Sequence, residues 1–166
     1  MVAIEFRTCE EKDVARFQRL AQELYAEDPN LEGVCPDVSL TYRDLAAKPD
    51  KGRVVIIDVD GRAVGYGIMI FFWSNEYGGN LIEIDELYID ETARGLGVGT
   101  RFFAWMRQSF PDSKGWTLQV AHTNPGALKL YERLGFKASR NQHMIKVFDD
   151  PKFTGLLEDT GSKAHL

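Results

Sequence analysis

Residues that commonly bind metals or form disulfides are scarce in this sequence. Its 166 residues include two cysteines, Cys9 and Cys35, and three histidines. The cysteines lack the spacing of a redox or zinc motif, which predicts two reduced thiols in a reducing compartment. The histidines follow no H-E-x-x-H or similar pattern, and His122 is interpreted as an ordinary, partly exposed residue. We therefore expect no metal site.

Long apolar runs and an excess of positive charge are also missing. No apolar run approaches the roughly 20 residues of a membrane span, and the first seven residues lack the basic flank and apolar centre of a secretion signal. The net charge of −5 argues against nucleic acid, because phosphate-dominated binding relies on clustered Lys and Arg. We expect a cytoplasmic protein with neither a membrane nor a nucleic acid as partner, and the acidic balance favours a cationic acceptor.

The length and composition are those of one folded domain. A chain of 166 residues with 44% hydrophobic and 27% charged residues can bury a substantial core. Residues from Asp149 onward read as a loosely attached segment. We predict a domain over residues 1–148 and a C-terminal tail over residues 149–166.

The N-terminal segment predicts a strand followed by an amphipathic helix. The strand covers residues 2–7, and Thr8-Cys9-Glu10-Glu11 has the spelling of a capping box that begins the helix. The apolar face of the helix consists of Val14, Phe17, Leu20, Ala21 and Leu24. Three acids lie near its end: Glu23, Glu27 and Asp28. We interpret these acids as a solvated helix face, with the border of an acceptor site as the alternative.

The next segment predicts a short helix and a hairpin. A loop over residues 28–37 leads to a helix over residues 39–47. The β-branched strand over residues 54–59 and the strand over residues 63–73 are joined by Asp60-Gly61, a strong hairpin turn, so we expect them to pair antiparallel.

The strand over residues 81–89 carries three acids, which is unusual for a central strand. At least one of them needs a cleft, water or a cationic partner. A regular strand places alternate residues on opposite faces, unless a β-bulge shifts the phase. One face then holds Glu83, Asp85, Leu87 and Ile89. The other holds Ile82, Ile84, Glu86 and Tyr88.

The glycine-rich stretch Arg94-Gly95-Leu96-Gly97-Val98-Gly99-Thr100 follows this strand and opens a helix that runs to about Phe110. Its glycines let the backbone N–H groups approach an anion at the positive end of a helix, which is typical of a pyrophosphate cradle; a simple tight turn is the alternative. No lysine precedes Thr100, which excludes a nucleotide triphosphatase loop, and Phe102 stands where a dinucleotide fingerprint needs glycine.

A second motif, Asn124 to Phe136, predicts a short, well-bounded helix after a strand over residues 115–121. It begins with an N-cap and a proline, Asn124-Pro125, and ends at Gly135. Taken alone, Tyr131 on its apolar face is a core aromatic residue. Beyond this helix we expect a terminal hairpin, with a short strand, a turn over residues 139–142 and a strand over residues 143–148.

Together the two motifs resemble the GNAT-type N-acetyltransferases. Arg/Gln-x-x-Gly-x-Gly/Ala is similar to the acetyl-CoA loop of that family, and Asn-x-x-Ala-x-x-Leu-Tyr-x-x-x-Gly-Phe is similar to its second coenzyme-binding motif. The resemblance covers residues 81–148 well. It implies a single-domain α/β fold with a mixed, mostly antiparallel sheet of about seven strands, splayed at its centre and flanked by about four helices.

The resemblance also implies roles for individual residues. Acetyl-CoA, as co-substrate, would run beside the central strand, with its pyrophosphate on the glycine loop. The implied coenzyme-binding residues are Leu87, Tyr88, Ile89, Arg94, Gly95, Leu96, Gly97, Val98, Gly99, Thr100, Asn124, Ala127 and Tyr131. Tyr131 would stand near the thioester sulfur, and the general base would be Glu83 or Asp85. Glu86 would orient a cationic acceptor.

These residue types suit acetyl transfer to an amine. An amine attacks a thioester only when neutral, so a carboxylate must take its proton, directly or through water. A phenol beside the departing thiolate can supply a proton. We expect a small-molecule amine acceptor and leave a homodimer open. The alternatives are a non-catalytic coenzyme A sensor and an acyltransferase that uses a longer acyl-CoA or a protein amino terminus.

Overall fold

The computed structural model describes residues 2–28, 35–141, 143 and 144. The chain divides into two compact units, Met1–Gly135 and Phe136–Leu166. All helices and strands named below belong to the first unit, and the described residues of the second form neither. The expected terminal hairpin falls partly on residues 142 and 145–148, and the expected tail over 149–166 falls wholly outside the described residues.

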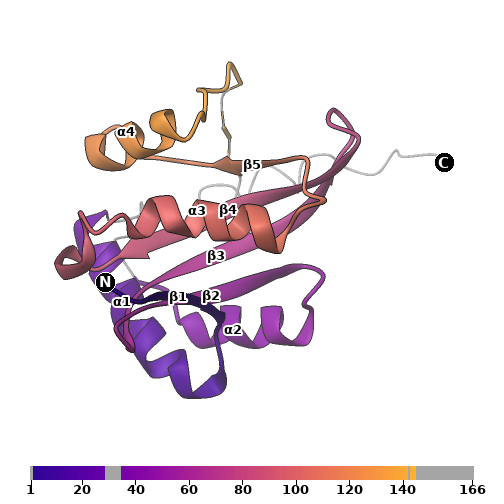
Figure 1. Ribbon diagram of the computed structural model, residues 1–166. Coiled ribbons are helices and arrows are strands. Elements are labelled where there is room, and N and C mark those ends of the chain that lie inside the picture. Colours follow the sequence, from indigo (N-terminus) through magenta and orange to yellow (C-terminus); the bar gives the residue numbers. More distant parts are fainter. Residues whose placement is uncertain (1, 29–34, 142, 145–166) are drawn as a thin grey trace, which may run out of the picture. The chain divides into compact units, whose positions relative to one another are not determined.

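Within the described residues, five strands form one sheet in sequence order (Figure 1). They are β1 (Ile4–Thr8), β2 (Gly52–Val59), β3 (Arg62–Ser74), β4 (Gly79–Ile89) and β5 (Gly115–Leu118). Neighbouring strands from β1 to β4 pair antiparallel, whereas β4 and β5 pair in parallel. This mixed, mostly antiparallel sheet confirms the predicted fold class, with five described strands where about seven were expected.

Helices cover both faces of the sheet (Figure 1). The α1 helix (Val14–Glu27) and the α2 helix (Val38–Ala47) pack on one face, where Phe17 and Leu20 of α1 are buried against Tyr66 and Ile68 of β3. The α3 helix (Val98–Ser109) covers the other face, and α4 (Pro125–Arg133) follows β5. A Cβ on Gly67 would lie 2.8 Å from Phe102 of α3, so this glycine permits close packing of helix on strand.

The first helical turn begins later than the sequence predicted. Thr8 still belongs to β1, and the amide of Cys9 donates to the carbonyl of Val54 (2.9 Å), so the chain cannot turn before Glu10. The turn starts with the 3-10 helix η1 (Glu11–Asp13), and the amide of Glu10 donates to Asp13 Oδ2 (2.9 Å). The predicted capping box on Thr8 is therefore wrong, because strand pairing holds that residue.

A β-bulge at Asp85 changes which acids share a face of β4. Ile68 of β3 pairs with Glu86 and the next residue, Met69, pairs with Ile84, so Asp85 is an extra residue on β4. The face of α1 and α2 now carries Glu83, Glu86 and Tyr88. The face of α3 carries Ile82, Ile84, Leu87 and Ile89. The strict alternation of faces predicted for this strand is thus wrong, because a β-bulge shifts its phase.

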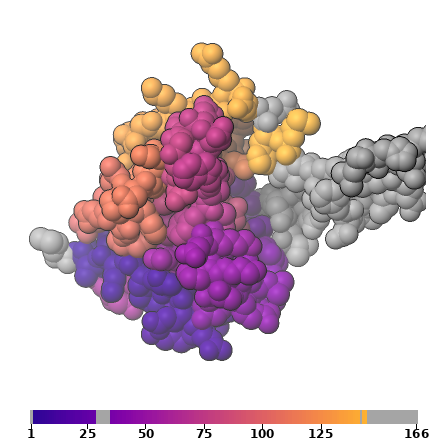
Figure 2. Space-filling view, turned by 90° about the vertical axis from the view of Figure 1, so that its right-hand side faces the viewer, coloured from indigo at the N-terminus to yellow at the C-terminus, as the bar shows by residue number. Residues whose placement is uncertain are grey.

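The β3–β4 hairpin extends beyond the start of β2. Figure 2 looks onto this end of the sheet, where the magenta hairpin stands above the purple α2. Three large apolar side chains here are exposed: Phe72, Trp73 and Tyr77. The β2–β3 hairpin turns at the other end of β3. There Asp60 (φ 49°) and Gly61 (φ 77°) adopt the left-handed conformations that the Asp-Gly sequence predicted.

Candidate active site

A cavity of about 680 Å³ lies beside the end of β4 that extends past its pairing with β5, and α4 and the end of α1 flank it. The two strands pair only from Leu81–Gly115 to Ile84–Leu118, whereas β4 continues to Ile89. The β5 strand ends at Leu118, where its pairing with β4 ends, and is therefore shorter than the predicted strand over 115–121. Among the predicted coenzyme-binding residues, those that line the cavity are Leu87, Tyr88, Ile89, Arg94, Gly95, Gly97, Val98, Gly99, Thr100, Asn124, Ala127 and Tyr131. Leu96, whose side chain is exposed, is not among the lining residues.

The backbone of β4 presents polar groups to this cavity. The amide of Asp90 donates to the carbonyl of Val64 in β3 (2.8 Å), so alternate residues back from Asp90 face β3. The backbone groups of Leu87 and Ile89 consequently face away from β3, beyond the point where pairing with β5 ends. The carbonyl of Ile89 accepts from Arg94 Nε (2.8 Å). The remaining groups can bind an extended ligand in the manner of an added strand.

The glycine loop before α3 is shaped for an anion. Gly95 (φ 79°) and Gly97 (φ 77°) are left-handed, and a Cβ at either position would protrude into open space. Gly97 is also the N-cap of α3, so the amides of the first helical turn lack intrahelical acceptors. Gly99 has a different role, because a Cβ there would lie 2.8 Å from Leu130 Cδ2 and would displace the end of that side chain.

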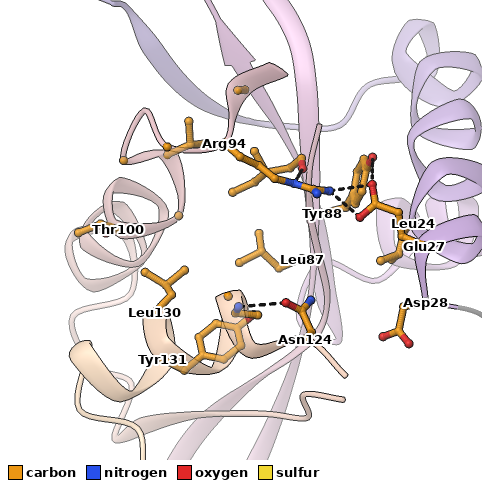
Figure 3. A pocket seen from close by; sticks show the side chains of 18 of the residues that line it. Leu24, Glu27, Asp28, Leu87, Tyr88, Arg94, Thr100, Asn124, Leu130 and Tyr131 are labelled. Atoms are coloured by element: carbon orange, nitrogen blue, oxygen red, sulfur yellow. Dashed lines mark hydrogen bonds and ion pairs between the residues drawn. The ribbon is translucent and has the colours of Figure 1, made fainter. Parts of the chain in front are cut away.

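Arg94 joins the loop to the end of α1 (Figure 3). Its guanidinium donates to Glu27 Oε1 (2.8 Å) and Oε2 (2.7 Å) and lies 5.6 Å from the centre of the Tyr88 ring. The Tyr88 hydroxyl donates to the same carboxylate (3.2 Å). Burial, and then the negative charge of Glu27, raise the pKa of Tyr88.

Glu27 and Asp28 at the end of α1 are exposed, as the solvated-face interpretation expected, and both also line the cavity. Glu27 and Arg94 are 67 residues apart, and no local spacing in the sequence indicated that they would meet. Other lining residues that sequence reasoning missed are Leu24, Ala93, Thr123, Gly126, Leu130 and Arg133. The helical periodicity of α4 could have found Leu130, which shares a face with Ala127 and Tyr131.

The α4 helix brings Asn124 and Tyr131 to the cavity from the side opposite α1 (Figure 3). Asn124 Oδ1 accepts from the amide of Ala127 (3.0 Å), as the predicted N-cap requires. Tyr131 is 8% exposed, and its ring packs edge-on against Phe103, with centroids 5.9 Å apart. Burial raises the pKa of Tyr131, so the phenol stays protonated at neutral pH.

The three acids of β4 do not line the cavity and differ in their surroundings. Both carboxylate oxygens of Glu86 are occupied, because Oε1 accepts from the Tyr25 hydroxyl (2.7 Å) and Oε2 from the Tyr66 hydroxyl (2.6 Å). Glu83 accepts a hydrogen bond from the Thr117 hydroxyl of β5.

Asp85 differs from its neighbours, because it stands in the bulge and is the first residue of β4 after the last pair with β5. The residue as a whole is exposed. Even so, desolvation of its carboxylate raises its pKa most, and the negative charges of Glu86 and Glu83 raise it further. Asp85 is therefore a carboxylate with a raised pKa at the point where the strands part.

No group of three or more His, Cys, Asp or Glu side chains in the described part of the chain is placed to hold a metal ion. No helix there has the length and apolar character needed to cross a membrane. His122 is exposed and does not line the cavity.

A glycine-rich loop at a helix N-terminus is typical of α/β proteins that bind a phosphate-bearing ligand. Residues 17–136 match the acetyltransferase (GNAT) family, which is most of the chain, and the protein belongs to this family. The resemblance predicted from the two motifs is confirmed.

Individual relatives agree with this assignment. The chain is 30% identical over 100 residues to an uncharacterized N-acetyltransferase of Methanocaldococcus jannaschii, over 58% of this chain and 44% of that protein. It therefore spans less than half the length of this relative.

Solved structures share the fold. An integron cassette protein from the mobile metagenome of Cole Harbour Salt Marsh matches with a TM-score of 0.71 and 26% identity, over 88% of this chain and 91% of that one. An aminoglycoside N-acetyltransferase solved in complex with CoA matches with a TM-score of 0.67 and 14% identity, over 89% of this chain and 96% of that one. The second likeness concerns the fold alone.

Proposed function

We propose that the protein transfers an acetyl group from acetyl-CoA to a primary amine. The observation that carries the proposal is the cavity beside the end of β4, which joins the glycine loop, the outward backbone of β4 and the buried Tyr131 in one cleft. Membership of the acetyltransferase family supports the reaction type.

The residues of the cleft fit the parts of coenzyme A. The left-handed Gly95 and Gly97 leave open space above the first amides of α3, where a pyrophosphate would bind. The backbone groups of Leu87 and Ile89 would bind the amides of the pantetheine arm. Asn124 uses its Oδ1 as a helix cap, which leaves its Nδ2 as the donor to the arm or to the acceptor.

The proposed chemistry uses two side chains. Bound acetyl-CoA supplies the acetyl group as a thioester, and a neutral amine attacks its carbonyl carbon, so that a C–N bond forms while the C–S bond breaks. Asp85 takes the proton of the amine, directly or through water, and Tyr131 gives a proton to the sulfur that leaves. We choose Asp85 over Glu83 as the base because Asp85 stands where the strands part and has a raised pKa.

A small cationic amine is the acceptor that the charges favour. Glu83, Asp85 and Glu86 lie close together on β4, and their field would concentrate a protonated amine. Asp90 contributes little to this field, because its carboxylate accepts from the amide of Thr92 (2.8 Å) and lies 3.6 Å from Arg16.

The test is a transfer assay with acetyl-CoA at low and high salt. The acceptors are spermidine, an aminoglycoside, a free amino acid and a peptide without net charge. We expect turnover with a cationic small amine that weakens as salt rises, since salt screens exposed charges. Preference for the peptide, without salt dependence, would reject the cationic acceptor. Binding of coenzyme without transfer to any acceptor would favour the sensor alternative.

A further inference from the structure

Four charged residues line the cavity within the described part of the chain: Glu27, Asp28, Arg94 and Arg133. Arg94 is already neutralised, because its guanidinium binds both oxygens of Glu27 and the carbonyl of Ile89. Arg133 is exposed, and no hydrogen bond or ion pair joins its side chain to another described residue. Arg133 is therefore the cation of the cavity that is available to a ligand.

The position of Arg133 is set by the packing of α4 on α3. Leu130 touches Gly99 in the first turn of α3, and Arg133 follows Leu130 by three residues, which places it on the same side of α4 one turn further on. Asn124 stands at the other end of α4, about 14 Å away at 1.5 Å per residue. Arg133 thus lines the cavity on the side of α4 that faces the first turn of α3, which follows the glycine loop.

We propose that Arg133 binds the 3′-phosphate of coenzyme A and makes the enzyme select CoA over 3′-dephospho-CoA. This inference rests on the proposed function. The pyrophosphate has the backbone amides of the glycine loop as partners, whereas the 3′-phosphate is a separate dianionic group on the ribose and needs a cation of its own. A guanidinium presents paired donors that match phosphate oxygens. Without Arg133, the acids Glu27 and Asp28 would outweigh Arg94 in charge and would repel a polyanion.

A purely structural role for Arg133 is the competing explanation. A cation in the last turn of a helix interacts favourably with the helix dipole, and Arg133 is the last residue of α4. That role predicts that Arg133→Gln lowers the free energy of unfolding by the same amount without ligand, with CoA and with 3′-dephospho-CoA. Recognition of the 3′-phosphate predicts a loss of affinity for one ligand only.

The experiment measures the Kd of CoA and of 3′-dephospho-CoA by calorimetry for the wild type, Arg133→Gln, Arg133→Lys and Lys129→Gln. Lys129→Gln is the control, because Lys129 is an exposed cation of the same helix that does not line the cavity. For Arg133→Gln we expect CoA to bind about 10- to 100-fold more weakly, the range for a hydrogen bond to a charged group. Its affinity for 3′-dephospho-CoA should not change. Arg133→Lys should retain part of the preference, and the control should keep all of it.

Each other outcome overturns the inference. If Arg133→Gln weakens both ligands equally, Arg133 acts on a part that they share or on the helix. If the preference for CoA survives in Arg133→Gln, another residue binds the 3′-phosphate. In both of these cases the proposed function stands, because the wild type binds CoA. If the wild type binds neither ligand, the proposed function itself fails, and this inference fails with it.

Discussion

Among single residues, Tyr131 allows the cleanest test of the chemistry. Tyr131 is buried and its ring packs against Phe103, so Tyr131→Phe keeps this packing and removes only the hydroxyl. We expect kcat to fall by roughly ten- to a thousandfold, the scale of a lost proton donor, while the Kd of CoA stays the same. Steady-state kinetics and calorimetry measure the two quantities. An unchanged kcat would leave Tyr131 with a packing role alone.

The acids around Asp85 should affect the pH dependence of kcat. A base works when ionised, so if Asp85 is the base, as proposed, kcat should rise with pH through its pKa, which desolvation and the charges of Glu86 and Glu83 hold above its usual value. Removing either neighbouring charge lowers that pKa. Glu86→Gln and Glu83→Gln should therefore both shift the acidic limb of the kcat profile to lower pH, Glu86→Gln by more.

The control for this shift is Glu76→Gln in the β3–β4 turn, which removes the same charge at an exposed position away from the site. It should leave the acidic limb in place. A limb that does not move in Glu83→Gln and Glu86→Gln would mean that the profile reports a group other than Asp85.

At the level of elements, the glycine loop can be tested against a matched turn. Gly97 and Gly61 both have φ 77°, and a Cβ at either position would meet nothing within 4 Å. Alanine at either position costs roughly 1–2 kcal/mol of backbone strain. At Gly97 the loop can relax to another conformation, and CoA must then restore the cradle, so we expect about 5- to 30-fold weaker binding.

Gly61→Ala serves as the control, because it lies in the β2–β3 turn and should lose similar stability with no change in the Kd of CoA. Thermal unfolding and calorimetry on both variants separate the two effects. Equal CoA affinity in the wild type and Gly97→Ala would show that the loop does not take part in binding CoA.

Elements whose limits depend on local chemistry could be predicted from the sequence. The N-cap Asn124, the proline after it and Gly135 (φ 89°) define α4, and the structure places the helix at Pro125–Arg133. The bulge at Asp85 could not be located, because it depends on the register with β3. The ion pair of Glu27 with Arg94 was missed for a related reason, since it joins elements that meet only in the folded chain.

For the whole molecule, the division between domain and tail stays a prediction. If residues 149–166 are a loosely attached tail, a chain that ends at residue 148 should keep its Tm within about 2 °C and its Kd for CoA unchanged. Differential scanning calorimetry with and without CoA measures both. A fall in Tm of more than about 5 °C would place part of this segment in the folded domain.

The early end of the β4–β5 ladder has a consequence for hydration. Without a ligand, the outward backbone groups of Leu87 are open to water, so a coenzyme bound there, as proposed, would exchange hydrogen bonds with water for new ones. Each exchange contributes only about 0.5–1.5 kcal/mol, whereas a covered group left without a partner costs about 1–3 kcal/mol. The strand would therefore select against wrong ligands mainly through the free-energy cost of covered backbone groups without partners. An analogue of the right shape that lacks the pantetheine amides would displace the water and form none of the replacement hydrogen bonds.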